Sequence, residues 1–164
     1  MAQFKNSQEF LDKLNQWFNA LIAPPLLFMG YGYLEIYSGR VSGFTRANDL
    51  VTGVTTLIIV TGMVMLSIRF KREVRIVGDL KSLKDQLEQY LIRAKKYYLQ
   101  VFALSSLCVL FLFSFGRLEF SAAYAFILFT LSLFKPTLIS LAKTFRLKDE
   151  VKAAFIKKES LIYE

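Results

Sequence analysis

The sequence predicts an all-α fold: a four-helix transmembrane bundle, with a cytoplasmic helical hairpin between spans two and three and a cytoplasmic amphipathic C-terminal helix. The first observation behind this class is composition, since 54% of the 164 residues are hydrophobic while 21% are charged. A soluble domain of this size buries only about two-thirds of its surface, so it could not hide so many apolar side chains. The second observation is that these side chains are collected in four runs almost free of charge. Lipid is therefore expected to be their solvent.

Each run is long enough to cross a bilayer, which takes about 20 mostly apolar residues. The expected spans, in chain order, are approximately 14–37, 50–69, 97–116 and 120–142. Pro24 and Pro25 interrupt the first run, which is too long for the apolar core of a cleaved signal peptide, so we expect it to be retained. Lys135 interrupts the fourth. Together the runs predict a single integral membrane domain over residues 1–164.

Lys and Arg are unevenly divided between the segments that connect the runs. Residues 1–13 carry two, the 69–96 segment carries nine and the tail from 143 to 164 carries six. The two loops on the other side, 35–49 and 117–119, carry three between them. Because cytoplasmic segments are enriched in Lys and Arg, both termini are predicted to be cytoplasmic. A positive inner face and a retained first span suit a bacterial inner (plasma) membrane.

The segment between spans two and three predicts a cytoplasmic hairpin over 70–96. Its apolar residues recur every three or four positions and therefore share one helix face. They are Leu80, Leu83, Leu87, Tyr90 and Ala94. We expect the second helix to continue to about Val77, to stop at Gly78, and to be followed by a new helix with Asp79 as its N-cap. That new helix is expected to continue into the third span.

The two ends of the chain also have apolar residues at helical spacing, Phe4, Leu11 and Leu14 at the start and Leu147, Val151 and Phe155 in the 143–164 tail. Two arrangements are open. The ends either pack with the hairpin in a small bundle, within one chain or between copies, or lie on the membrane surface with lysines at anionic headgroups.

Lys135 is the main candidate functional residue, because charged groups inside spans are costly. It shares a mostly small face with Ser132, so we expect it to point into the bundle. One hypothesis is a cation that lines a pore or solute path, and another is snorkelling towards the inner boundary. A third is a structural clamp, in which the ammonium binds carbonyls released by Pro24 and Pro25. Pro136 likewise releases the carbonyl of Ser132.

Three further residues are candidates for function or packing. Glu35 lies near the outer end of the first span and is expected to pair with Arg40 or Arg117, with an ion-entry site as the alternative. Thr55 and Gly62 belong to a mostly small face of the second span, which predicts contact with another helix. The alternative for the threonines of this face is solute coordination.

The sequence contains no histidine, and its single cysteine, Cys108, lies within an apolar run. Histidine-ligated haem, most catalytic zinc sites and nucleophile pairs that use histidine are therefore excluded. We expect no catalytic, cofactor or metal site and no enzyme activity. Nucleic acid is not an expected partner either, because membrane orientation explains the basic surface and no recognition motif accompanies it.

The predicted function is that of a non-catalytic subunit of a homo- or hetero-oligomeric membrane complex. It would contact other membrane subunits or its own copies through the small-residue faces of its spans and through the cytoplasmic hairpin. The alternative is an oligomeric ion channel or small-solute transporter with Lys135 near the path.

Overall fold

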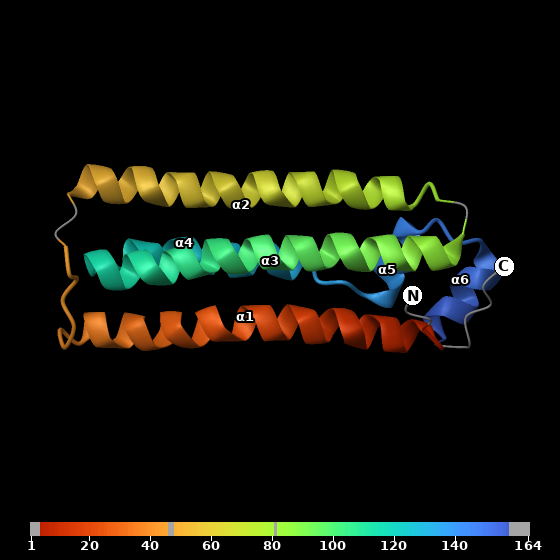
Figure 1. Ribbon diagram of the computed structural model, residues 1–164, viewed down its shortest axis with the longest axis horizontal. Helices are drawn as coiled ribbons and strands as arrows, with labels where there is room; N and C mark the ends of the chain where they lie inside the picture. The colour runs from red at the N-terminus through yellow and green to blue at the C-terminus, as the bar shows by residue number, and fades with distance from the viewer. Residues whose placement is uncertain (1–3, 46–47, 81, 158–164) are drawn as a thin grey trace. The chain divides into compact units, whose positions relative to one another are not determined.

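The computed structural model describes residues 4–45, 48–80 and 82–157, and every regular element in these ranges is an α-helix (Figure 1). The six helices are α1 (Ser7–Tyr37), α2 (Asp49–Val77), α3 (Leu83–Phe115), α4 (Glu119–Leu133), α5 (Leu138–Thr144) and α6 (Asp149–Ile156). The predicted all-α class is confirmed.

Two of these helices, α2 and α3, are long and apolar enough to cross a membrane. The bent pair α4 and α5 makes a third if it forms one span. Helix α1 is not among these candidate spans, since Pro24, Pro25 and Glu35 lie within its most apolar part. The chain is therefore compatible with an integral membrane protein, and the predicted span at 14–37 stays a prediction.

The hairpin between α2 and α3 begins and ends close to its predicted positions. Helix α2 continues to Val77 and α3 runs without interruption to Phe115, as predicted. The prediction that Asp79 caps the new helix is wrong. Helix α3 begins four residues later, and the Asp79 carboxylate instead accepts a hydrogen bond from the Arg146 guanidinium at 2.5 Å.

The prediction of one continuous helix over 120–142 is also wrong. Helix α4 ends at Leu133, α5 begins at Leu138, and the two axes differ by 70°. Pro136 explains the interruption, because it has no N–H to donate and disfavours helical conformation in the residue before it. Thr137 then caps α5, since its hydroxyl accepts the Ser140 amide N–H and the Ser140 hydroxyl accepts that of Thr137.

The chain forms two compact units. The described residues of unit 1 lie within 1–19, 68–98 and 135–164. They therefore combine the start of α1, the hairpin ends of α2 and α3, and helices α5 and α6. Packing of both chain ends with the hairpin corresponds to the within-chain bundle, one of the two arrangements predicted for the ends.

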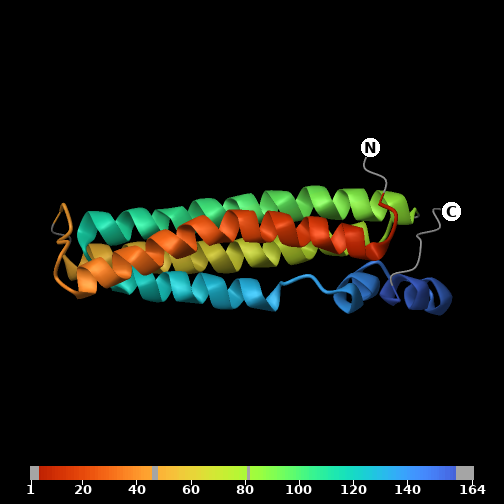
Figure 2. The ribbon, with the colours of Figure 1, turned by 90° about the horizontal axis from the view of Figure 1, so that it is seen from below.

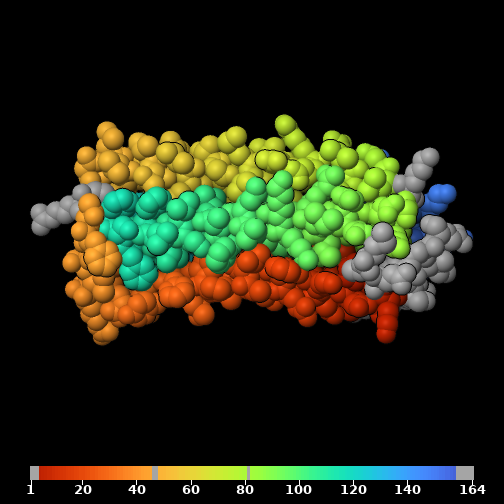
Figure 3. All heavy atoms as spheres, in the orientation of Figure 1, coloured from red at the N-terminus to blue at the C-terminus, as the bar shows by residue number. Residues whose placement is uncertain are grey.

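Unit 2 consists of residues 20–67 and 99–134, so it combines the remaining segments of α1, α2 and α3 with α4. These four segments lie side by side (Figures 1 and 2), and the α3 segment lies between those of α1 and α2 on the face shown in Figure 3. The Phe113 side chain of α3 packs directly on the α1 backbone at Gly32, where a Cβ would lie 2.7 Å from the ring.

One end of unit 2 is fixed by ion pairs and by a close backbone contact. Arg117 pairs with Asp49 and, at 3.1 Å, with Glu119. A Cβ at Gly43 would lie only 2.3 Å from the carbonyl carbon of Phe115, so this loop requires glycine. The outward faces of the unit expose large apolar side chains, including Leu27 at 73%, Ile58 at 65% and Leu110 at 59%.

Candidate interaction surface

The interior of unit 1 is a cluster of aromatic rings around Tyr90 on α3. The centroid of the Tyr90 ring lies 5.7 Å from that of Phe145, 6.1 Å from Phe10 and 6.3 Å from Phe70. Burying such side chains stabilises a fold by about 1.5–3 kcal/mol each. Burial also raises the pKa of the Tyr90 hydroxyl, because the charged form is poorly solvated there. This cluster holds α3 against segments from the start, middle and end of the chain.

A buried hydrogen bond joins the two ends of the chain within unit 1. The Ser7 hydroxyl, in the first turn of α1, donates to the backbone carbonyl of Phe155 at 2.6 Å. The Phe155 ring is 1% exposed and lies 6.2 Å from Phe145. Helix α6 is thereby tied to both α1 and the aromatic cluster.

Two polar side chains of α3 fix the geometry of the hairpin. The Arg93 guanidinium donates to the backbone carbonyl of Glu73 on α2 at 2.5 Å. One turn from the hairpin tip, the buried Gln86 amide donates to the carbonyl of Leu80 at 2.8 Å. These bonds join α3 to α2 and to the hairpin turn. They therefore fix the distance between the two arms of the hairpin, which are the end of α2 and the start of α3.

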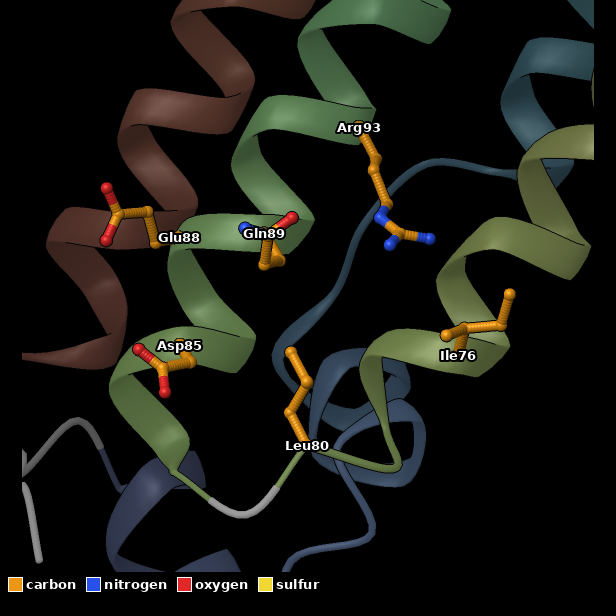
Figure 4. Close-up of a pocket in the computed structure, with 6 residues that line it drawn as sticks. All are labelled: Ile76, Leu80, Asp85, Glu88, Gln89 and Arg93. Atoms are coloured by element: carbon orange, nitrogen blue, oxygen red, sulfur yellow. The ribbon is translucent and has the colours of Figure 1, made fainter.

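A surface groove of about 300 Å³ lies along these arms (Figure 4). Its lining residues are Ile76, Leu80, Asp85, Glu88, Gln89 and Arg93. Figure 4 shows the four polar residues on α3, Ile76 on α2 and Leu80 in the turn, with Arg93 reaching towards α2. Ile76 and Leu80 form the apolar wall of the groove. On the α3 side, Arg93 faces this wall, whereas the Asp85 and Glu88 carboxylates lie at the outer rim, turned away from it (Figure 4). Such a surface can bind another chain through apolar contact and paired charges.

The residues predicted from unit 2 have packing contacts or local partners. Glu35 pairs with Arg40 at 3.4 Å, which confirms the first of its two expected partners. The Thr55 hydroxyl donates to the carbonyl of Val51 in its own helix at 2.8 Å. Gly62 is half-buried, and a Cβ there would lie 3.9 Å from Leu104 of α3, so this face contacts another helix as predicted.

Lys135 does not have the placement that the sequence predicts. It lies in the non-helical stretch between α4 and α5 and is exposed, so the expectation of a lysine on a helix face that points into the bundle is wrong. The reason is the helix end enforced by Pro136, whose own side chain is buried. Ser132 is exposed, and its hydroxyl donates to the Phe129 carbonyl at 2.7 Å.

Pro24 and Pro25 both lie inside α1, with Pro24 exposed and Pro25 buried. They belong to unit 2, whereas Lys135 belongs to unit 1. The clamp that would join them stays a prediction.

The sequence contains a signal for the groove that its apolar pattern does not reveal. Asp85, Gln89 and Arg93 are spaced by four residues and therefore share one face of α3. The contribution of Ile76 and Leu80 has no such signal, because it depends on how α2 and its turn lie beside α3. In the described part of the chain, no group of three or more His, Cys, Asp or Glu residues is placed to hold a metal ion.

A comparison with protein families, curated proteins and solved structures finds no match to this chain.

Proposed function

We propose that this protein is an integral membrane protein with four spans, and that α1 is one of them. Helices α2 and α3 and the bent pair α4 and α5 have the apolar composition that spans require. The α1 segment from Ala20 to Tyr37 packs in the same unit as α4 and the apolar segments of α2 and α3, and it exposes Leu26, Leu27 and Phe28. A segment that lies beside spanning helices and exposes large apolar side chains is stable only if lipid covers them.

Both termini and the hairpin are assigned to the cytoplasm, in a bacterial inner (plasma) membrane. The distribution of Lys and Arg supports this orientation, because segment 69–96 alone carries nine of them. The hairpin and its groove then lie on the cytoplasmic side.

Within that topology, we assign the protein the role of a non-catalytic subunit of a membrane complex. The observation that carries this role is the groove on unit 1, which combines exposed apolar walls with charges of both signs. In unit 2, by contrast, the hydroxyls of Thr55 and Thr130 each donate to a carbonyl of their own helix, and that of Thr52 donates to the carbonyl of Asn48, just before α2. These hydroxyls serve packing within the span and give the channel reading no support.

A channel or small transporter is the second candidate, because of the interruption between α4 and α5. Discontinuous membrane helices frequently carry the solute sites of transporters. Lys135 lies exposed in this interruption, next to a bend of 70°. In this role it would attract an anionic solute.

Purification of the full chain in mild detergent, followed by native mass measurement and reconstitution into liposomes, separates the two candidates. We expect other chains to co-purify in fixed ratio and the liposomes to remain impermeable to ions. A homo-oligomer that conducts ions, with conductance altered by Lys135→Met, would instead establish the channel.

The orientation is tested with a membrane-impermeant thiol reagent on intact cells. The native Cys108 is buried, so single cysteines can be introduced at two exposed positions, Ser42 and Gln89. We expect Ser42→Cys to react from outside and Gln89→Cys to react only after permeabilisation. The reverse pattern would show that the topology is inverted. Reaction of both cysteines from outside would exclude the proposed topology, because it places them on opposite sides of the membrane.

A further inference from the structure

We infer that the hairpin groove docks an amphipathic helix of a different protein. That helix carries basic residues where it meets Asp85 and Glu88, acidic residues where it meets Arg93, and apolar residues between them. This inference rests on the proposed function and names the chemistry of the partner subunit.

The spacing of the groove residues matches two turns of a helix. Asp85, Gln89 and Arg93 follow one another at four-residue intervals on α3, so the carboxylate and guanidinium ends are about 12 Å apart along the axis. The opposite wall is apolar, with Ile76 59% exposed and Leu80 37% exposed. A docked helix with an apolar stripe flanked by opposite charges would contact the apolar wall and the charged residues of α3 at the same time.

Arg93 is held in place before any partner arrives. One of its terminal nitrogens, Nη1, donates to the Glu73 carbonyl, and a guanidinium has five N–H donors in a fixed plane. The other donors can therefore bind a carboxylate with little loss of side-chain entropy. Asp85 and Glu88 have no ion pair at 4 Å or less among the described residues, so their carboxylates are available for basic groups.

A second copy of this chain fits the groove poorly. Copies in one membrane are related by a rotation axis along the membrane normal, which keeps their α3 helices parallel and at equal depth. A two-fold contact through the groove would then place Arg93 against Arg93 and the carboxylates against carboxylates. Like charges opposite one another oppose such a contact, whereas a partner with its own sequence can present the complementary order.

The test uses the full chain in lipid nanodiscs and two labelled helical peptides of identical composition. In the first peptide, two lysines and two glutamates flank a leucine stripe at opposite ends. In the second, each end carries one lysine and one glutamate. Binding is followed by fluorescence anisotropy, and we expect the first peptide to bind about fivefold to tenfold more tightly, as a few exposed charge pairs allow.

Charge-reversal variants assign the preference to the groove. Asp85→Lys combined with Glu88→Lys should abolish the difference between the two peptides. Glu150→Lys, at an exposed position on α6 outside the groove, should keep it. Equal affinities for wild type, failure of both peptides to bind, or loss of the preference in Glu150→Lys would each overturn the inference.

Two further readouts separate this inference from the proposed function. If Gln89→Cys forms a cross-linked dimer in native membranes with a short thiol cross-linker, the groove is a contact between copies and the inference is wrong. If partner chains co-purify equally with wild type and with the Asp85→Lys, Glu88→Lys variant, the membrane-subunit role stands while the groove is excluded as its docking site.

Discussion

Replacing Gly78 with alanine tests how closely α5 packs against the hairpin turn. A Cβ at Gly78 would lie 2.3 Å from the carbonyl oxygen of Thr144. Carbon–oxygen contacts normally measure about 3.3–3.6 Å, so the two backbones would have to separate by about 1 Å. The described glycines with positive φ are Gly39 and Gly116. The effect at Gly78 is therefore steric and does not arise from backbone conformation.

Forcing such a separation in a packed interior costs about 1–3 kcal/mol. Unit 1 covers about 80 residues, and for a domain of that size each kcal/mol lowers the unfolding midpoint by about 4–8 °C. We therefore expect Gly78→Ala to unfold at least about 4 °C below wild type. The measurement is thermal unfolding of the full chain in mild detergent, followed by the fluorescence of Trp17. This single tryptophan lies in unit 1, with the Lys95 ammonium 4.5 Å from its ring centroid.

Gly53→Ala is the matched control. A Cβ at Gly53 meets no heavy atom of the described residues within 4 Å, and alanine favours a helix over glycine by about 1 kcal/mol. Its midpoint should equal or exceed that of wild type. If Gly78→Ala also unfolds at or above the wild-type midpoint, the close packing of α5 on the turn is wrong.

Three other substitutions address the core. Phe155→Ala removes a ring that is 1% exposed, so it should lower the free energy of unfolding by about 3–5 kcal/mol and release α6. In limited proteolysis this variant should be cleaved earlier than wild type. The control Ile156→Ala, at a 36% exposed position, should be cleaved like wild type. Burial raises the pKa of Tyr90 above its usual value near 10, so above about pH 10 the unfolded chain releases a proton that the folded protein keeps, and stability falls as pH rises. Tyr90→Phe should reduce that fall in pH-dependent melting, and an unchanged fall would exclude Tyr90 as its cause. The Tyr124 hydroxyl is buried without a hydrogen-bond partner among the described residues, so Tyr124→Phe should leave the free energy of unfolding unchanged or raise it by up to roughly 1 kcal/mol. A clear decrease in the thermal midpoint would show that the hydroxyl is bonded.

The hairpin that carries the candidate surface could be predicted from the sequence. The predicted hairpin over 70–96 nearly coincides with the segment of unit 1 formed by residues 68–98. Of its predicted stripe, Leu87, Tyr90 and Ala94 are buried, because a repeat of three or four residues fixes which helix face is apolar. The Glu35–Arg40 pair was also predictable, since its partners are only five residues apart.

Two predictions, the continuous helix over 120–142 and the N-cap at Asp79, were wrong for a related reason. In both cases the structure at that point depends on a specific residue, either adjacent or distant in the chain, and not on the composition of the segment. Pro136 was in the sequence, but the apolar character of 120–142 concealed the helix end that it imposes. Asp79 follows a helix stop and is of a residue type that often caps helices, yet its carboxylate binds Arg146, 67 residues later. A side chain that can cap a helix can equally pair with a cation, and only the fold determines which cation is near.

By itself, the sequence determined that this chain is helical, that α2 and α3 form a long hairpin, and which face of the α3 arm is apolar, because these properties depend on residues close together in the chain. The tertiary structure alone decided that Phe155 packs on Phe145, that the Gly78 turn contacts Thr144, and that Ile76 and Leu80 complete a groove beside Arg93. Those features join segments that are distant in the chain. Their existence depends on the free energy of packing whole elements together, which no local pattern records.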